Sequence, residues 1–248
     1  MPPVNSLYEP GYYKTSYRAL GLRGLIRMRG LLRLPLAYLA TRRMAAAPST
    51  WMPQMWADLA CTEKELSARF LEFSAPYRQA FRVLGFQELC FKRLKGILNP
   101  SHRDDGGINF LDSSRCHFGQ LIYNKSHVRA PVNIDREQVV ISFTAVFEKS
   151  AFSYSSYVKN PFDSPPNHKV VKIKSSDPQH IYQCFVNDLK RRSEQPRHFP
   201  DLESLQHWFD ANTLETFNYR VRKGLFIRMT DAEVALARRN IPPPVPRE

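Results

Sequence analysis

Hydrophobic and polar positions alternate in the middle of the chain, between residues 139 and 147. One series is Ile141, Phe143, Ala145 and Phe147, and the other is Val140, Ser142, Thr144 and Val146. A period of two residues predicts a strand with one buried face. Glu148 to Ala151 then predicts a turn into a second strand at residues 152–159, and residues 169–174 alternate in the same way.

The stretch before residue 139 predicts further antiparallel strands. Residues 87–98 and 108–124 are rich in Phe, Leu, Ile and Tyr, and two turn signals separate them. These signals are Asn99-Pro100 and the charged, glycine-containing run from Asp104 to Gly107. We therefore expect an antiparallel β-meander of about five strands, with a loop at residues 99–107.

Capping signals predict a helix before these strands. Thr62 and Glu65 form a T-x-x-E capping box at its start. Ala75-Pro76 predicts a restart, because proline is tolerated at a first helical position, and Gly85 predicts the end. The apolar side chains of the core-facing side are Phe73, Tyr77, Phe81 and Leu84.

The last third of the chain predicts four more helices. Asp177-Pro178 provides an N-cap and a first-turn proline, followed by the inward residues Ile181, Phe185 and Leu189. Residues 201–210 and 213–223 predict two helices that end at Gly224, with Leu205, Phe209, Phe217 and Val221 inward. Thr230 with Glu233 caps a last short helix.

The sequence thus predicts an α+β fold, with an antiparallel β-meander of about five strands packed against several helices and preceded by a basic helical N-terminal segment. Composition suggests three parts. Residues 1–57 form the basic, leucine- and arginine-rich segment, residues 58–228 form the α+β domain, and residues 229–248 form a short helix with a proline-rich tail.

Positive charge is concentrated near the N-terminus. The chain has a formal net charge of +13, and residues 1–57 contain eight Lys and Arg against the single acid Glu9, a net charge of +7. This quarter of the chain therefore carries more than half of the excess. Such a cationic segment is expected to bind an anionic surface, and both membrane lipid and nucleic acid present one.

We predict that the N-terminal segment lies in a membrane interface, where arginine stems follow the lipid and guanidinium groups meet phosphate. The membrane-binding residues are then Arg23, Leu25, Arg27, Arg29, Leu32 and Arg33. A pair of short helices packed on the domain and a cleaved targeting peptide are the alternatives. Arginines interrupt the leucines too often for a spanning helix, and no secretory signal is apparent, so we expect a cytoplasmic, peripheral protein.

No motif predicts catalytic, cofactor-binding or metal-binding residues. The GxSxG, GxGxxG and GxxxxGK[ST] patterns do not occur, and no histidines pair at HxxxH spacing. The four cysteines form no CxxC pair and fit a reducing compartment. The densest polar cluster, from His102 to Asp105, suits a solvated turn better than an acid–base pair.

Three weaker candidates remain. Cys116-His117 is a poor dyad, because neighbours on a strand point to opposite faces. The hydroxyls of Ser142, Thr144, Ser153, Ser155 and Tyr157 line the polar face of the central hairpin, where they either face solvent or floor a polar ligand pocket. Basic runs at residues 190–192 and 220–223 either complement helix dipoles or bind phosphate.

The order of these elements also resembles a known group. Leu84-Gly85-Phe86, a strand meander, VVISFTAVFEKSAFSYSS at residues 139–156 and SSDPQHIYQCFVNDL at residues 175–189 are similar to a group of uncharacterised bacterial proteins. In that group a short N-terminal hydrophobic region precedes an α+β domain. The resemblance covers roughly residues 70–224 and implies the fold, with no established activity.

The leading functional hypothesis is a non-enzymatic binding or scaffold domain, held at a membrane by the cationic N-terminus. Its expected partner is anionic membrane lipid. The sequence pI of about 9.8 motivates a second hypothesis, a nucleic-acid-associated protein. The third is an enzyme with a site on the polar sheet face.

Overall fold

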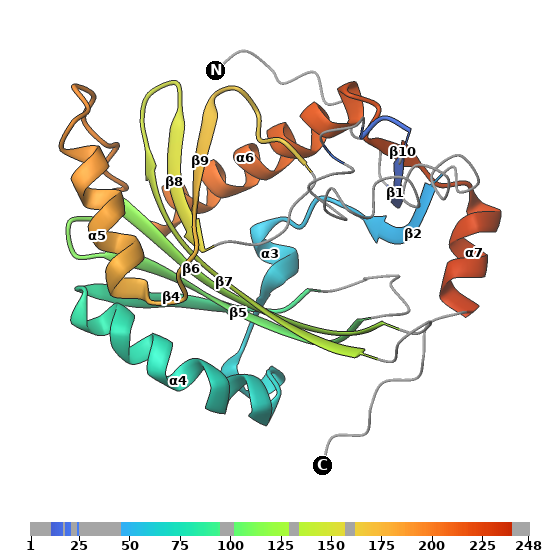
Figure 1. Ribbon diagram of the computed structural model, residues 1–248, viewed down its shortest axis with the longest axis horizontal. Coiled ribbons are helices and arrows are strands. Elements are labelled where there is room, and N and C mark those ends of the chain that lie inside the picture. The colour runs from blue at the N-terminus through green and yellow to red at the C-terminus, as the bar shows by residue number, and fades with distance from the viewer. Residues whose placement is uncertain are drawn as a thin grey trace.

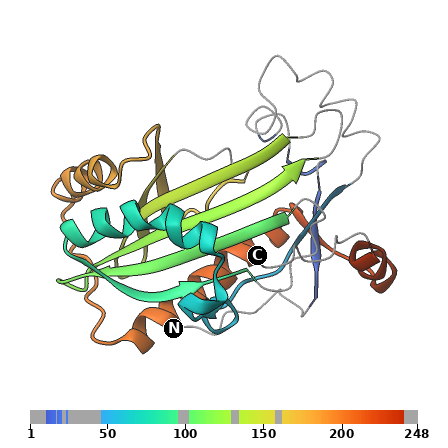
Figure 2. The ribbon, with the colours of Figure 1, turned by 90° about the horizontal axis from the view of Figure 1, so that it is seen from below.

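A large curved sheet with helices on both faces forms the centre of the computed structural model (Figure 1). The structure describes residues 11–16, 18–20, 24, 46–94, 102–128, 134–156 and 162–239. α4 (Ala68–Val83) and α5 (Pro178–Leu189) lie on one face of the sheet, and α6 (Leu202–Arg222) lies on the other (Figure 2). The predicted α+β class is therefore confirmed.

Seven strands of the described chain form this sheet, in the order β3-β4-β5-β6-β7-β8-β9. Their bounds are β3 Ala60–Cys61, β4 Phe86–Lys92, β5 His102–Asp112, β6 His117–Val128, β7 Ile134–Val146, β8 Ala151–Ser156 and β9 His168–Ile173. Neighbours from β3 to β8 are antiparallel, whereas β8 and β9 are parallel. The sheet is thus mixed and larger than the predicted five-stranded antiparallel meander. Alternation along β9 is the same in either direction, so the sequence pattern could not reveal its orientation.

Residues 102–107 form the first half of β5 and not the predicted loop. Gly106 and Gly107 both pair with residues of β6. A Cβ at Gly106 would lie 2.6 Å from the ring of Phe70, and a Cβ at Gly107 would lie 3.0 Å from the side chain of Lys92. The two glycines therefore allow close packing on opposite faces of one strand, a role that a turn signal in the sequence conceals.

The predicted strand at residues 108–124 contains the turn that separates β5 from β6. Asp112 holds this turn: its Oδ1 accepts hydrogen bonds from the N–H groups of Cys116 at 3.0 Å and His117 at 2.9 Å. Its Oδ2 accepts one from Ser114 Oγ at 2.6 Å. A turn organised by one aspartate needs neither glycine nor proline, which explains why the strongest turn signals missed it.

The main hydrophobic core lies between the sheet, α4 and α5. The four residues predicted to face inward from β7 and its end, Ile141, Phe143, Ala145 and Phe147, all belong to it. Phe81 of α4 is fully buried and stacks on Phe110, with ring centroids 4.0 Å apart. α5 begins at the predicted N-cap and buries Ile181 and Phe185, as expected.

α4 is one continuous helix, without the predicted restart at Pro76. Its N-cap is Ser67, whose Oγ accepts a hydrogen bond from the N–H of Phe70 at 3.1 Å. The capping box at Thr62 forms as predicted, but it starts a separate 3-10 turn, η2 (Glu63–Glu65). Core packing of residues on both sides of Pro76 compensates for the backbone hydrogen bond that a proline removes.

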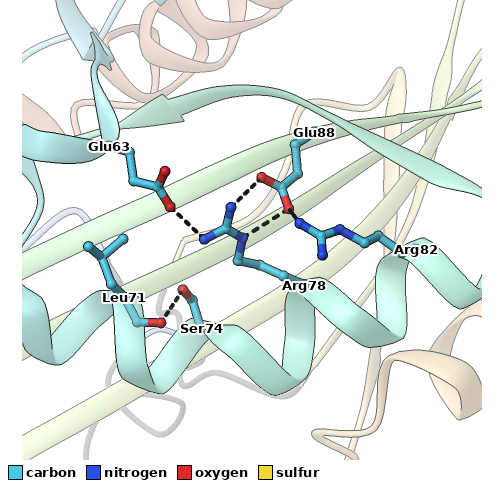
Figure 3. Close-up of polar contacts among 6 residues, drawn as sticks. All are labelled: Glu63, Leu71, Ser74, Arg78, Arg82 and Glu88. Carbon is cyan, nitrogen blue, oxygen red and sulfur yellow. Dashed lines mark hydrogen bonds and ion pairs between the residues drawn. The ribbon is translucent and has the colours of Figure 1, made fainter.

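An ion-pair network joins the outer side of α4 to β4 (Figure 3). Arg78 donates to both carboxylate oxygens of Glu88, from Nε at 2.9 Å and from Nη2 at 2.8 Å, and to Glu63 from Nη1 at 2.6 Å. Arg82 adds a bond of 3.0 Å to Glu88. Burial alone would raise the pKa of Glu88, but the two arginines together lower it. The half-buried charges here are therefore mutually satisfied.

α6 is a single helix, whereas the sequence predicted two helices with a break near residue 211. Asp201 caps its start by accepting a hydrogen bond from the N–H of Ser204 at 2.7 Å, and Gly224 ends it with a φ of 66°. Leu205 packs in a second apolar cluster with Trp56 and Phe118. Packing along the sheet outweighs the weak helix propensity of the Asp210-Ala211-Asn212 stretch.

A smaller sheet joins segments from both ends of the described chain, in the order β10-β1-β2. Its strands are β1 Tyr13–Ser16, β2 Ala46–Trp51 and β10 Phe226–Arg228. β1 and β2 lie within residues 1–57, for which the sequence predicted a basic helical segment and no strand. The ring of Tyr13 packs on Phe217 with centroids 4.9 Å apart. Local sequence could not predict β1, because its partner β10 lies more than 200 residues away.

Two short helices complete the fold. α3 (Trp56–Leu59) leads from the small sheet into β3. α7 (Asp231–Arg239) has the predicted cap, in which the N–H of Thr230 donates to Glu233 at 3.0 Å. Of the predicted basic segment at residues 1–57, the structure describes residues 11–16, 18–20, 24 and 46–57, which include β1, β2 and the start of α3. The arginine- and leucine-rich residues 25–45 lie outside the described residues.

Candidate functional site

A cavity of about 400 Å³ lies between the sheet and α6. Strands β4, β5, β6 and β9 contribute to its lining, together with the segment before α3. The apolar lining includes Met52, Leu59, Ile122, Phe209, Phe217 and Phe226. Sites for small organic molecules range from about 300 to 1,000 Å³ and combine an apolar lining with a few polar groups. The cavity is therefore a candidate ligand site by size and by composition.

One side of α6 forms a wall of this cavity. Its cavity-lining residues are Phe209, Asn212, Thr213, Thr216, Phe217 and Arg220. Spacings of three and four residues place them on one helical face. Polar side chains on an inward face are a sequence signal for a cavity. Phe209 and Phe217 were predicted to face the core, and the polar residues between them were not predicted to line a site.

Lys92, the last residue of β4, is a buried cation in this lining. Its exposed fraction is 7%, and Nζ lies 5.6 Å from the ring centroid of Phe209. Within the described ranges no carboxylate forms an ion pair with it. Burial lowers the pKa of the ammonium to about 8, an effect that Cys90 partly opposes. A buried cation without a carboxylate partner costs stability, which makes it a functional candidate.

Arg220 is the second cation of the lining. Its guanidinium lies over two rings, 4.9 Å from the centroid of Phe162 and 5.5 Å from that of Phe226. Its buried Nε has no hydrogen-bond partner in the part of the chain that the structure describes, and neither does Oε1 of Gln54 in the same lining. Burial lowers the pKa of Arg220 to about 10.

Lys92 and Arg220 lie next to different positions along α6. Lys92 reaches the helix at Phe209, and Arg220 follows eleven residues later. At 1.5 Å per residue, these two helix positions are about 16 Å apart. The two positive charges therefore lie at separate positions along the α6 side of the cavity, and they do not converge on one anionic group.

Asp105 is an acidic residue of the lining, and its carboxylate is already engaged. Oδ1 lies 3.1 Å from Nε2 of His102 and 4.0 Å from Nε of Arg93, which also lines the cavity. Oδ2 accepts a short hydrogen bond from the N–H of Leu94. Because these groups occupy Asp105, the charges of Lys92 and Arg220 are not balanced within the described lining.

A smaller cavity of about 180 Å³ adjoins the first, and both have Gln120, His168, Phe209 and Asn212 in their linings. Four hydroxyl residues predicted on the polar sheet face, Ser142, Thr144, Ser153 and Ser155, line the smaller cavity. The fifth, Tyr157, lies outside the described residues. Of the two readings left open by the sequence, these hydroxyls therefore fit the floor of a polar cavity.

A chain of hydrogen bonds runs along the wall of the smaller cavity. Oγ1 of Thr144 lies 2.7 Å from Oγ of Ser153, which lies 2.8 Å from Nε2 of His168. Burial lowers the pKa of His168, whereas a hydrogen bond with Asn212 and the charge of Glu215 oppose that shift. The imidazole is therefore neutral near pH 7 and has one nitrogen able to accept a proton.

The six residues predicted to bind a membrane, Arg23, Leu25, Arg27, Arg29, Leu32 and Arg33, lie outside the described residues. Their role stays a prediction from the sequence. No helix in the described ranges is both long and apolar enough to cross a bilayer.

The other sequence candidates do not form a joint site. Cys116 Sγ contacts the carbonyl oxygen of Ser114 at 3.4 Å, while Nδ1 of His117 lies 3.1 Å from Asp112. Among the basic runs, Arg220 lines the larger cavity, whereas Arg192 stacks on Phe152 with its Cζ 3.8 Å from the ring centroid.

The described residues contain no cluster of three or more His, Cys, Asp or Glu side chains that could hold a metal ion. All four cysteines are free. Comparisons with protein-family models, with curated proteins and with solved structures found no match to this chain. The geometry of the two cavities is therefore the basis for a functional proposal.

Proposed function

We propose that this protein binds a small organic anion in the cavity between the sheet and α6. The observation that carries the proposal is the presence of two cations in one lining without paired carboxylates among the described residues: Lys92, which is buried, and Arg220, which is half-buried and has a buried Nε. Burial of an unpaired charge is costly, so a fold retains it where a ligand supplies the opposite charge.

The lining also indicates the kind of anion. Phenylalanine and aliphatic side chains form much of the wall, which favours a ligand with an apolar body. Lys92 and Arg220 meet different levels of the α6 wall, which favours an extended molecule. The amide of Gln54 and the hydroxyls of Thr213 and Thr216 add hydrogen-bonding groups between them. An extended carboxylate or phosphate monoester with an aliphatic or aromatic body satisfies these features.

The direct test is thermal unfolding of the full chain with matched ligands. Decanoate, decyl phosphate and naphthoate supply the anions, and decanol and naphthalenemethanol supply neutral bodies of similar size. A ligand at about 100 times its Kd stabilises the folded state by about 2.7 kcal/mol. We expect the anions to raise Tm in a concentration-dependent manner and the neutral compounds to have little effect.

Two substitutions locate the binding. Lys92→Met and Arg220→Met each remove one charge from the cavity, and each should weaken anion binding by about tenfold or more. Lys169→Met is the matched control, because Lys169 is exposed and its Nζ lies 5.9 Å from the ring of Phe152 outside this lining. Equal binding of neutral and anionic ligands, or unchanged anion binding by both cavity variants, would overturn the proposal.

Attachment to anionic membranes through Arg23, Arg27, Arg29 and Arg33 is a separate proposal that rests on the sequence. Sedimentation with anionic and neutral liposomes tests it on the full chain. Replacement of these four arginines by glutamine should abolish binding to anionic liposomes and leave the ligand-induced Tm shift unchanged. Retention by neutral liposomes to the same extent would contradict an electrostatic attachment.

A further inference from the structure

We propose that the protein hydrolyses small carboxylic esters in the smaller cavity, with Ser153 as the nucleophile, His168 as the general base and Asn212 as the residue that positions His168. This activity goes beyond anion binding and does not depend on it. All three residues line the cavity of about 180 Å³, and they come from β8, β9 and α6 respectively.

The geometry between nucleophile and base is that of an activated serine. Oγ of Ser153 lies 2.8 Å from Nε2 of His168, within the distance over which a proton passes between the two groups. The side chain of Asn212 hydrogen-bonds the same imidazole. With the ring N–H donated to Asn212, Nε2 is left to accept the proton of Ser153.

The surroundings of Ser153 suit such a role. Its exposed fraction is 4%, and the hydroxyl of Thr144 lies 2.7 Å from Oγ of Ser153. At this distance Thr144 can donate to the Ser153 oxygen while Ser153 donates to Nε2 of His168. The side-chain amide of Gln120 lines the same cavity, and its Nε2 donates one hydrogen bond to Oδ1 of Asn109 at 3.2 Å. The second N–H of that amide is the donor that we assign to a carbonyl oxygen that gains negative charge. The parallel pairing of β8 and β9 places Ser153 and His168 on one face of the sheet.

The reaction uses an ester and water. Oγ of Ser153 attacks the acyl carbon as His168 takes its proton, and the bond from that carbon to the leaving oxygen breaks while His168 protonates the departing alcohol. Water then attacks the acyl-serine, His168 takes a proton from it and returns the proton to Ser153, and the carboxylic acid leaves. The volume of the cavity favours a small acyl group, such as acetyl or butyryl.

The first measurement uses the wild-type chain with a fluorophosphonate, which forms a stable bond with an activated serine. Intact mass and peptide mapping should place one adduct at Ser153. p-Nitrophenyl acetate should then show a burst of p-nitrophenol followed by steady turnover. An unlabelled Ser153, or the absence of turnover above the solvent rate, would overturn the inference without any variant.

Variants separate catalysis from structure. Ser153→Ala should abolish labelling, and His168→Gln should lower the rate by about 10²–10⁴-fold. Ser204→Ala is the control, since its hydroxyl donates to the carbonyl of Asp201 at 2.8 Å and lies outside the linings of both cavities. Esterase activity of Ser153→Ala equal to that of wild type would assign the hydrolysis elsewhere.

Asn212 is a positioning residue, and its test is a pH profile. Asn212→Asp puts a negative charge beside the imidazole, which should raise the pKa of His168 and move the acidic limb of the rate profile to higher pH. A purely structural asparagine would change the rate without moving that limb. Because the anion-induced Tm shift is measured in Ser153→Ala as well, failure of the esterase leaves the anion-binding proposal independently testable.

Discussion

The two faces of the large sheet differ in how tightly large side chains pack and in whether charged side chains are paired. On the α4 face, Phe81 stacks on Phe110 in a continuous core, and Arg78 is held by Glu88 and Glu63. On the α6 face, two cavities lie between sheet and helix, and the buried Lys92 and the half-buried Arg220 have no paired carboxylates among the described residues. The same strands build both faces.

The difference separates stability from function within one sheet. Dense aromatic packing and paired charges contribute to the free energy of unfolding, whereas open volume and unpaired cations reduce it. Proteins tolerate such local costs where a site requires them. We therefore infer that the α4 face holds the fold together and that the α6 face carries the chemistry.

The largest expected effect is on packing. Phe81→Ala removes a fully buried ring from the core and should lower the free energy of unfolding by about 3–5 kcal/mol. Phe209→Ala removes a ring that borders a cavity and is only partly buried, so it should cost about 1–2 kcal/mol. Urea unfolding followed by circular dichroism measures both. Equal losses would mean that the two faces are packed alike.

Replacing the unpaired cation Lys92 and the paired cation Arg78 should change the free energy of unfolding in opposite directions. Lys92→Met removes an unpaired buried charge and should raise the free energy of unfolding of the ligand-free protein by about 1–3 kcal/mol. Arg78→Met leaves Glu88 without its bidentate partner and should lower that free energy by about 1–3 kcal/mol. Guanidinium chloride titrations of both variants check the signs. A loss of stability in Lys92→Met would show that Lys92 is a structural residue.

The higher free energy of unfolding expected for Lys92→Met, relative to the wild type, should depend on pH in the alkaline range. The pKa of Lys92 is about 8 in the folded state and 10.5 as the ordinary value, so the unfolded chain binds more protons between these limits. The stability of the wild type should therefore rise relative to the variant as pH increases from 8 to 10.5. Thermal unfolding of both proteins at pH 7, 9 and 10 should show that the stability difference between Lys92→Met and the wild type becomes smaller. A difference that does not change with pH would contradict the buried, unpaired state of Lys92.

The smallest expected effect is on the α4 face in acid. The pKa of Glu88 is below its ordinary value of 4.5 in the folded state, so the stabilisation that it provides is present above pH 4.5 and is lost as pH falls through the lowered pKa. Glu88→Gln should therefore have a lower free energy of unfolding than the wild type at pH 6, by up to about 1 kcal/mol as for a partly exposed ion pair, and the loss should be smaller at pH 3. Urea unfolding at these two pH values tests the change, with Glu203→Gln, an exposed acid on α6, as the control.

Local signals in the sequence predicted the α4 face better than the α6 face. Alternation from Ile141 to Phe147, the N-cap at Asp177 and the glycine stop at Gly85 all appear as expected. These features depend on neighbours within a few residues, which a sequence pattern can show. The hydroxyls of Ser142, Thr144, Ser153 and Ser155 were also placed on one polar face, and a polar pocket above them was one of the two alternatives that the sequence left open.

The cavity residues could not be assembled from the sequence. Lys92 falls within the predicted strand at residues 87–98, where no signal marks it as a cavity residue. The run from Asp104 to Gly107 predicted a turn, whereas its pairing with β6 places it inside the sheet. Ser153, His168 and Asn212 come from three elements, and the parallel direction of β9 brings two of them together. A local pattern carries no information on that direction.

The sequence by itself determined the class of the fold, the inward face of the central strands and the ends of several helices, because side-chain period and capping act over one or two turns. The tertiary structure alone decided the mixed sheet, the pairing of β1 with β10 and the two cavities under α6. These features depend on contacts between residues far apart in the chain, which form only when the whole sheet and its helices pack.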